Sequence, residues 1–236
     1  MTSDYDLILK FIPPIATLLA AFFGAWFAYR LERKQKLSEL RKANIAASNR
    51  AFFILFQQLN TLALIQKDYL DPLRGRPEAF IAMQPILPDD HSEMSYDFSS
   101  LDFLLSTKLK QLLLDLWLEQ QRFREAIRVL NYRSSLHFSE VQPRLIAAGI
   151  QEKAEYPNTV FEKALGPLLY KTLQRTTEQV FHHVDRTVSS LDNLKGRLGD
   201  GLKDLFPEAN FLKLEIIKEE ANKGNTADRQ ATPASR

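Results

Sequence analysis

LKQLLLDLWLEQQRFREAIRVL, residues 109–130, carries an apolar residue or a glutamine at alternating intervals of four and three. These positions are Leu109, Leu113, Leu116, Gln120, Phe123, Ile127 and Leu130. An interval that averages 3.5 residues places them on one face of a helix, as in helices that pack against other helices. The stretch therefore predicts one helix of a bundle, with Gln120 as a polar position in its seam.

Two further stretches have this spacing. The longer one has its seam at Leu173, Thr177, Val180, Val184, Thr187, Leu191, Leu194 and Leu198, in a helix that Pro167 begins and Pro207 ends. The other has its seam at Phe52, Leu55, Leu59, Leu62, Gln66 and Tyr69 and ends at Asp71-Pro72. Three long helices joined by long connections predict an all-α protein, an up-and-down antiparallel helical bundle over residues 51–217.

Local signals set the expected ends of these helices. Ser99 or Ser100 would cap a short helix, Thr107 the long helix after it, and Thr159 with Glu162 would form a capping box. Weak alternation over residues 210–217 is compatible with a short strand. The polar residues 218–236 are expected to be a disordered tail.

Residues 11–29, FIPPIATLLAAFFGAWFAY, contain no charge. As a helix they would span about 28 Å, close to the thickness of a bilayer core of about 30 Å. Large residues stand where a signal peptidase would need small ones, so the segment reads as an uncleaved transmembrane anchor after a short outer tail, residues 1–10. The alternative is a buried core helix of a soluble protein.

Residues 30–50 hold seven basic and two acidic residues, a net charge of +5, and form the predicted stalk helix. The positive-inside rule then predicts a single-pass inner (cell) membrane protein with its N-terminus outside and its C-terminal domain in the cytoplasm. These charges could set the topology alone, or they could also bind anionic lipid headgroups. The candidates for either role are Arg30, Arg33, Lys34, Lys36, Arg41 and Lys42.

Small residues recur every four positions in the apolar segment, at Ala16, Ala20, Gly24 and Ala28. Such a stripe lets two membrane helices approach closely. It predicts a homo-oligomer or pairing with a partner membrane protein, although alanine is common enough in such helices for a chance pattern.

Residues 71–98 contain four prolines and cannot form a long helix. From residue 71 to residue 102 the net charge is −5. Apolar residues within this segment suggest that it packs across the bundle, and a partner-binding loop is the alternative. The opposite charges of the segment and the stalk, and the arginines of residues 122–133, suggest ion pairs between them.

Chemistry is sparse in this sequence. Without cysteine it has no thiol nucleophile and no cysteine-based zinc site, and no phosphate-loop, dinucleotide or hydrolase motif occurs. His137 with Glu140, and Glu178 with His182, have the spacing of metal ligands but are not expected to converge. We therefore expect no enzyme, no cofactor, no metal, no small-molecule substrate and no nucleic-acid partner.

The layout is similar to that of small bacterial single-pass proteins with a cytoplasmic helical domain, a likeness that implies no activity. The leading hypothesis is a non-enzymatic scaffold that tethers a cytoplasmic bundle to the membrane and assembles with itself or a partner. The alternatives are a conditional membrane effector, such as a toxin or phage-defence component, and an accessory subunit of a membrane complex.

Overall fold

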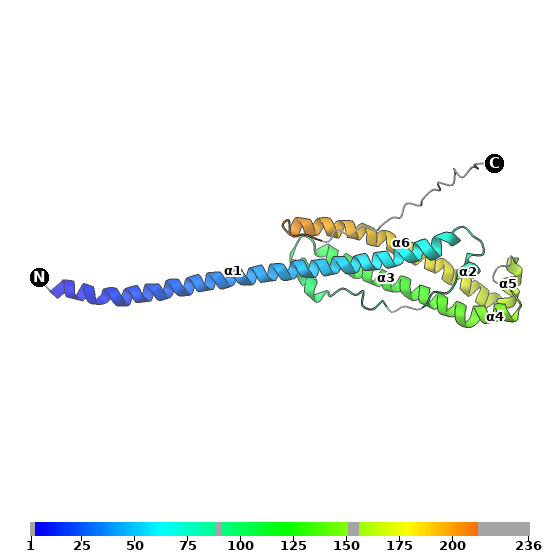
Figure 1. The fold of residues 1–236 in the computed structure, drawn as a ribbon, viewed down its shortest axis with the longest axis horizontal. Helices are drawn as coiled ribbons and strands as arrows, with labels where there is room; N and C mark the ends of the chain where they lie inside the picture. Colours follow the sequence, from blue (N-terminus) through cyan, green and yellow to red (C-terminus); the bar gives the residue numbers. More distant parts are fainter. Residues whose placement is uncertain (1–2, 88–90, 151–155, 212–236) are drawn as a thin grey trace, which may run out of the picture.

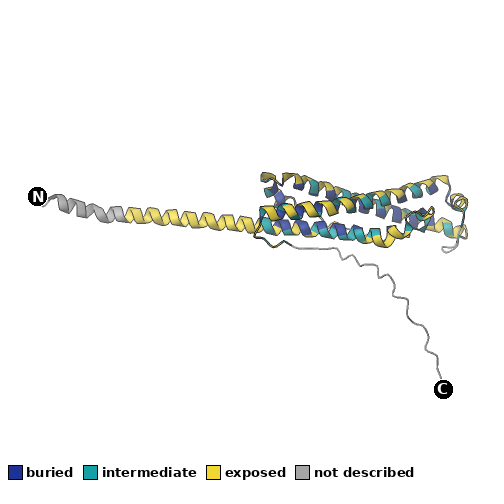
Figure 2. Cartoon of the chain, turned by 90° about the horizontal axis from the view of Figure 1, so that it is seen from above, coloured by how far each residue is buried: buried dark blue, intermediate teal, exposed yellow. Residues whose placement is uncertain are grey.

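A single helix, α1 (Ser3–Ile65), makes up the first 63 residues of regular structure. It is about 95 Å long at 1.5 Å per residue. The computed structural model describes residues 3–87, 91–150 and 156–211, with side chains described from residue 17 onward. The first part of α1 projects as an isolated rod, and only its last third enters the rest of the molecule (Figures 1 and 2).

Two more long helices complete the bundle, α3 (Lys110–Leu136) and α6 (Pro167–Leu205). Helix α6 packs against both α1 and α3. Figure 1 shows that α1 and α3 run in the same direction and that α6 runs antiparallel to both. The prediction of an all-α bundle is confirmed, but the predicted up-and-down antiparallel order of its helices is wrong, since α1 and α3 are parallel. Because α1 and α3 are parallel, the chain must return along the bundle between them without a long helix.

That return is made by residues 83–98, here called the strap, of which residues 88–90 lie outside the described part. The strap follows the short helix α2 (Ala79–Ala82) and leads into a 3₁₀ helix, Ser99–Ser106. Met83 and Tyr96 of the strap are buried in the main core. The prolines that forbid a helix here thus leave an extended segment that covers the bundle, as the apolar residues within it suggested.

A polar layer fixes the strap to both parallel helices. Gln58 of α1 donates to the carbonyl oxygen of Met94 at 2.7 Å and to Oε1 of Gln120 at 3.3 Å. The backbone N–H of Tyr96 also donates to Gln120 Oε1, at 3.2 Å, and the Tyr96 hydroxyl donates to Gln58 Oε1, at 3.2 Å. Gln120 is therefore polar within its seam because it binds the strap.

The predicted seams are buried almost throughout. All eight seam positions of α6 are buried, as are Phe52, Leu55, Leu59 and Leu62 of α1. On α3 only Leu113 is partly buried, and it still packs against the core. The 3.5-residue spacing thus identified the inner face of each helix correctly.

The α1 seam is wrong only at its end. A π-helical turn, Gln66–Leu70, follows α1, and within it Leu70 is fully buried while Tyr69 is 43 % exposed. A wider turn rotates the later side chains relative to an α-helix. A second π-helical turn, His137–Val141, leads into α4 (Gln142–Ala147). The second residue of α4, Pro143, has no backbone N–H to donate to an α-helical hydrogen bond.

Several expected ends are also wrong. Asp97, rather than a serine, caps the 3₁₀ helix, because it accepts from Ser99 Oγ at 2.5 Å and from the Ser100 N–H at 3.3 Å. Thr107 accepts from the N–H of Leu109 at 3.0 Å but does not cap α3 itself, whose N-cap is Leu109 without a side-chain hydrogen bond. No capping box forms at α5 (Asn158–Leu165), which begins after Pro157 without a side-chain cap.

The C-terminal expectations are tested only in part. The described residues contain no strand, and residues 212–217 of the predicted strand lie outside them, as does the tail. Gly201 lies inside α6, where a Cβ would stand 2.9 Å from Leu109 Cδ2 and 3.2 Å from Leu112 Cδ1, so glycine permits close packing of α6 against the start of α3.

The short helices close the end of the bundle farthest from the rod, where α4 and α5 lie together (Figure 1). A second, smaller core lies there, made of Phe80, Val141, Phe161, Leu165, Tyr170 and Leu173. The rings of Phe80 and Tyr170 meet edge to face, with 5.0 Å between their centroids.

Candidate functional site

The predicted small-residue stripe lies on the isolated part of α1. Every residue from 17 to 43 is exposed, including Ala20, Gly24 and Ala28, whereas the side chain of Ala16 lies outside the described part. Large apolar side chains are exposed beside the stripe on more than one face: Leu18, Leu19, Phe22, Phe23, Trp26 and Phe27. The structure shows no packing partner for this surface within the described residues.

Among the described residues, no helix has a window long and apolar enough to cross a membrane. The side chains of residues 11–16, the first third of the predicted span, are not among the described ones.

The basic stalk residues are exposed, and two of the named candidates have acidic partners. Lys36 pairs with Glu32 one turn earlier at 2.7 Å, and Arg41 donates to Glu208 after α6 at 2.7 Å. The Arg30 guanidinium lies over the Trp26 ring, 4.3 Å from its centroid. Arg33 and Lys34 have no ion pair with any described residue.

The expected ion pairs between the stalk and residues 71–102 are not found among the described residues; Asp89 and Asp90 lie outside them. The acidic partners of basic residues come mainly from the same helix, from α6, or from the residues just after α6. Of the arginines on α3, Arg124 reaches the strap only at Ser95 Oγ, 3.1 Å away. The prediction is wrong. Asp97 instead accepts from Ser99 and Ser100, and Asp71 pairs with Arg74 of the same segment.

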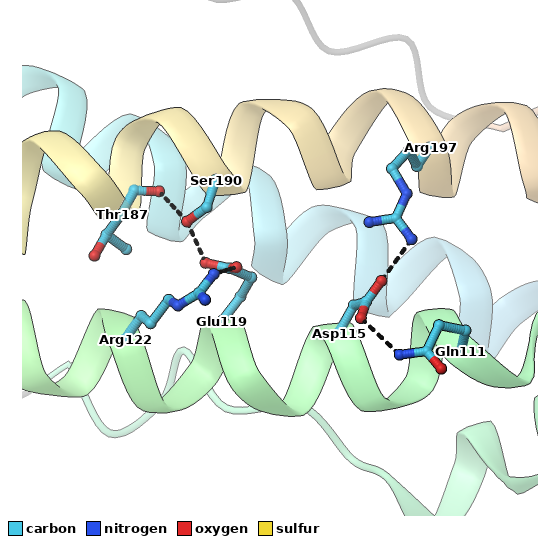
Figure 3. A network of polar contacts seen from close by, with 7 residues as sticks. All are labelled: Gln111, Asp115, Glu119, Arg122, Thr187, Ser190 and Arg197. Carbon is cyan, nitrogen blue, oxygen red and sulfur yellow. Dashed lines mark hydrogen bonds and ion pairs between the residues drawn. The ribbon is translucent and has the colours of Figure 1, made fainter.

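A groove of about 480 Å³ runs between α3 and α6, and most of the residues that line it have polar or charged side chains. The side chains come from successive turns of the two helices: Asp115, Leu118, Glu119 and Arg122 of α3, and Arg186, Ser189, Ser190, Asn193, Leu194 and Arg197 of α6. Figure 3 shows the network along it.

Glu119 is the centre of this network, although only 5 % of it is exposed. It accepts from Ser190 Oγ at 2.6 Å through one carboxylate oxygen and pairs with Arg122 through the other (Figure 3). One helical turn along, Asp115 accepts from Arg197 at 2.5 Å and from Gln111 at 3.1 Å. Both carboxylates are therefore neutralised, which a buried charge requires.

A second cluster lies at the far end of the bundle, around a fully buried Arg133. Its guanidinium donates to the carbonyl oxygen of Phe80 at 2.9 Å and to Thr177 Oγ1 at 3.4 Å. Burial lowers the pKa of Arg133 to about 10, so the side chain keeps its charge at neutral pH. Arg133 ties α2 to α3 and α6, and its Nη1 has no partner among the described residues.

His137, one turn after Arg133, is also buried. Its pKa falls to about 4, first because of burial and then because of the Arg133 charge, against a hydrogen bond with the Ile81 backbone. His182 is exposed and contacts His183, with 5.5 Å between ring centroids. Among the described residues no three His, Asp or Glu side chains form a cluster that could hold a metal.

We predict a loss of stability on acidification that depends on His137. Its pKa is lower in the folded chain than the usual value of 6.5, so the unfolded chain binds the proton first. The stability is complete above about pH 6.5 and declines toward about pH 4, by about 3 kcal/mol in all. Urea unfolding of H137Q should show a flatter pH profile in this window.

The matched control for this prediction is H182Q, which removes an exposed imidazole. Its profile should follow that of the unchanged chain. Equal profiles for H137Q and the unchanged chain would contradict the assignment to His137.

The sequence did not indicate a further polar contact, which joins α6 to the turns that follow α1. Arg74 forks onto Asp185 at 2.9 and 2.5 Å, and Gln66 donates to the same carboxylate at 2.7 Å. The hydrogen bond from Arg74 is the main cause of the lowered pKa of Asp185. These residues are far apart in sequence, so no spacing indicated the contact.

No protein-family model, curated protein or solved structure matches this chain.

Proposed function

We propose that this chain is a membrane-anchored scaffold: residues 11–29 of α1 cross a bilayer, and the bundle on the cytoplasmic side assembles with itself or with a partner. The observation that carries the proposal is the isolated rod. Its apolar residues 18–27 stay exposed although the same helix later enters a well-packed core. Water disfavours such a surface, and lipid favours it.

The flanks of the rod support a membrane boundary near Arg30. Trp26 and Tyr29 are the amphipathic rings that favour the headgroup level, and Arg30 stacks on Trp26. The exposed basic residues that follow, Arg33 and Lys34 among them, have the charge expected of a cytoplasmic stalk. Anionic headgroups would attract the same residues.

The continuity of α1 supports a tethering role. No proline or glycine interrupts residues 30–65, and the first buried residue after the rod is Ala47. A helix from Arg30 to Ala47 would hold the bundle about 25 Å from the boundary.

Membrane fractionation tests the anchor. The full chain should sediment with membranes and stay there after washes with high salt and with alkaline carbonate. Release by salt would mean that only the basic stalk binds lipid, and recovery in the soluble fraction would contradict any anchor.

Self-assembly through the small-residue stripe has its own test. A Cβ added at Gly24 meets no atom within 4 Å, so G24L should leave the single chain undisturbed. In a bilayer the leucine should hold two rods apart and abolish crosslinked oligomers. L37A, an exposed change beyond the segment, is the control, and unchanged crosslinking of G24L would contradict pairing through this stripe.

A further inference from the structure

The groove between α3 and α6 contains arginine hydrogen-bond donors that do not bond to other groove residues. Three arginines line it with two carboxylates, Glu119 and Asp115, which pair with Arg122 and Arg197. The third arginine, Arg186, is exposed and has no ion pair or side-chain hydrogen bond with any described residue. The lining thus has one positive charge in excess.

The register of the two helices brings Arg186 opposite Arg122. Helices α3 and α6 are antiparallel, and their contacts pair Asp115 with Arg197 and then Glu119 with Ser190. One further turn in the same direction reaches Arg122 on α3 and Arg186 on α6. Both arginines line the same cavity.

Arg122 pairs with Glu119 but keeps hydrogen-bond donors that Glu119 does not occupy. Its Nη1 pairs with the carboxylate, which leaves Nε and Nη2 of the planar fork for another acceptor. Glu119 is itself fixed by Ser190, so it positions the Arg122 side chain. The exposed Ser189 adds a hydroxyl donor to the same wall of the groove.

We propose that this groove binds the phosphate group of a small soluble molecule between Arg122 and Arg186. Phosphate oxygens accept from guanidinium forks with both charge and geometry in their favour. The volume of about 480 Å³ exceeds what one phosphate needs, so the rest of the ligand would lie along the groove toward Asn193.

The position of the groove separates a soluble ligand from a lipid headgroup. Asp185, next to Arg186, accepts from Gln66 just after the end of α1, so the site lies level with that end. If residues 11–29 cross the bilayer, as proposed above, the 36 residues from Arg30 to Ile65 place the site about 50 Å from the boundary. Headgroups of that membrane do not reach it.

Titration calorimetry of the full chain in detergent micelles, with inorganic phosphate and then pyrophosphate as probes, tests the site. The unchanged chain should bind pyrophosphate saturably. R186Q should weaken binding about tenfold or more, because a hydrogen bond to a charged group is lost. R122Q should weaken it comparably, and R175Q, an exposed arginine of α6 outside the groove, should not.

Absence of saturable binding, or equal weakening by R175Q and R186Q, would overturn the proposal. R186Q alters an exposed side chain, so it keeps the test valid if R122Q fails to fold. In a second arm, phosphatidic acid vesicles should bind the unchanged chain and R186Q alike. Loss of vesicle binding in R186Q would identify a headgroup site and overturn the soluble ligand. Membrane fractionation is independent of either result.

Discussion

Replacing Leu116 with alanine should lower the free energy of unfolding by about 3 kcal/mol. Leu116 is fully buried on the inner face of α3 and belongs to the main core. The removed atoms lose their burial, and the helices around them close the resulting cavity only in part. Urea unfolding of the full chain, followed by circular dichroism, measures the change.

Leu114, two residues earlier on the same helix, provides the matched control because it is 50 % exposed. L114A should change the free energy of unfolding by less than about 0.5 kcal/mol. Similar losses for L116A and L114A would mean that the face assigned to the core of α3 is wrong.

A pair of aspartates in the rod, L19D with F23D, should remove the chain from the membrane fraction. The two positions lie one turn apart near the middle of residues 11–29, where each aspartate opposes insertion by about 3 kcal/mol. Both side chains are about half exposed and lie far from the bundle, so the thermal unfolding of the bundle should not change. The measurement is sedimentation after an alkaline wash.

The control introduces the same two charges into the stalk, as L37D with L40D. Leu37 and Leu40 are each 60 % exposed on the same helix but lie outside the apolar segment. This variant should remain with the membrane. Equal release of both double variants would indicate a general charge effect rather than an inserted segment.

The helical faces could be predicted because burial repeats with the period of the helix. Leu173, Val184 and Leu198 of α6 illustrate this, since 3.5-residue spacing alone placed them inside. The parallel course of α1 and α3 could not be predicted, because periodicity is the same for either direction. It follows from the strap, whose route depends on Gln58 and Gln120, contacts that join residues 36 and 24 positions apart.

The polar sites were hidden by the usual assumption that charge means exposure. Arg133 was grouped with the arginines expected to pair with the acidic segment, yet it follows Leu130 by three residues, the interval at which the buried face continues. Glu119 likewise adjoins the seam position Gln120. Their positions next to the buried seam indicated that both side chains are buried. Their charge made an exposed position the more natural expectation.

The absence of cysteine makes one measurement direct. Single cysteines introduced as S3C and S38C would flank the apolar segment, and a membrane-impermeant maleimide can be applied to intact spheroplasts. If residues 11–29 anchor the bundle from the inner side, S3C is labelled at once, and S38C is labelled only after permeabilisation. Labelling of S38C in intact cells, or protection of both cysteines until permeabilisation, would contradict the account.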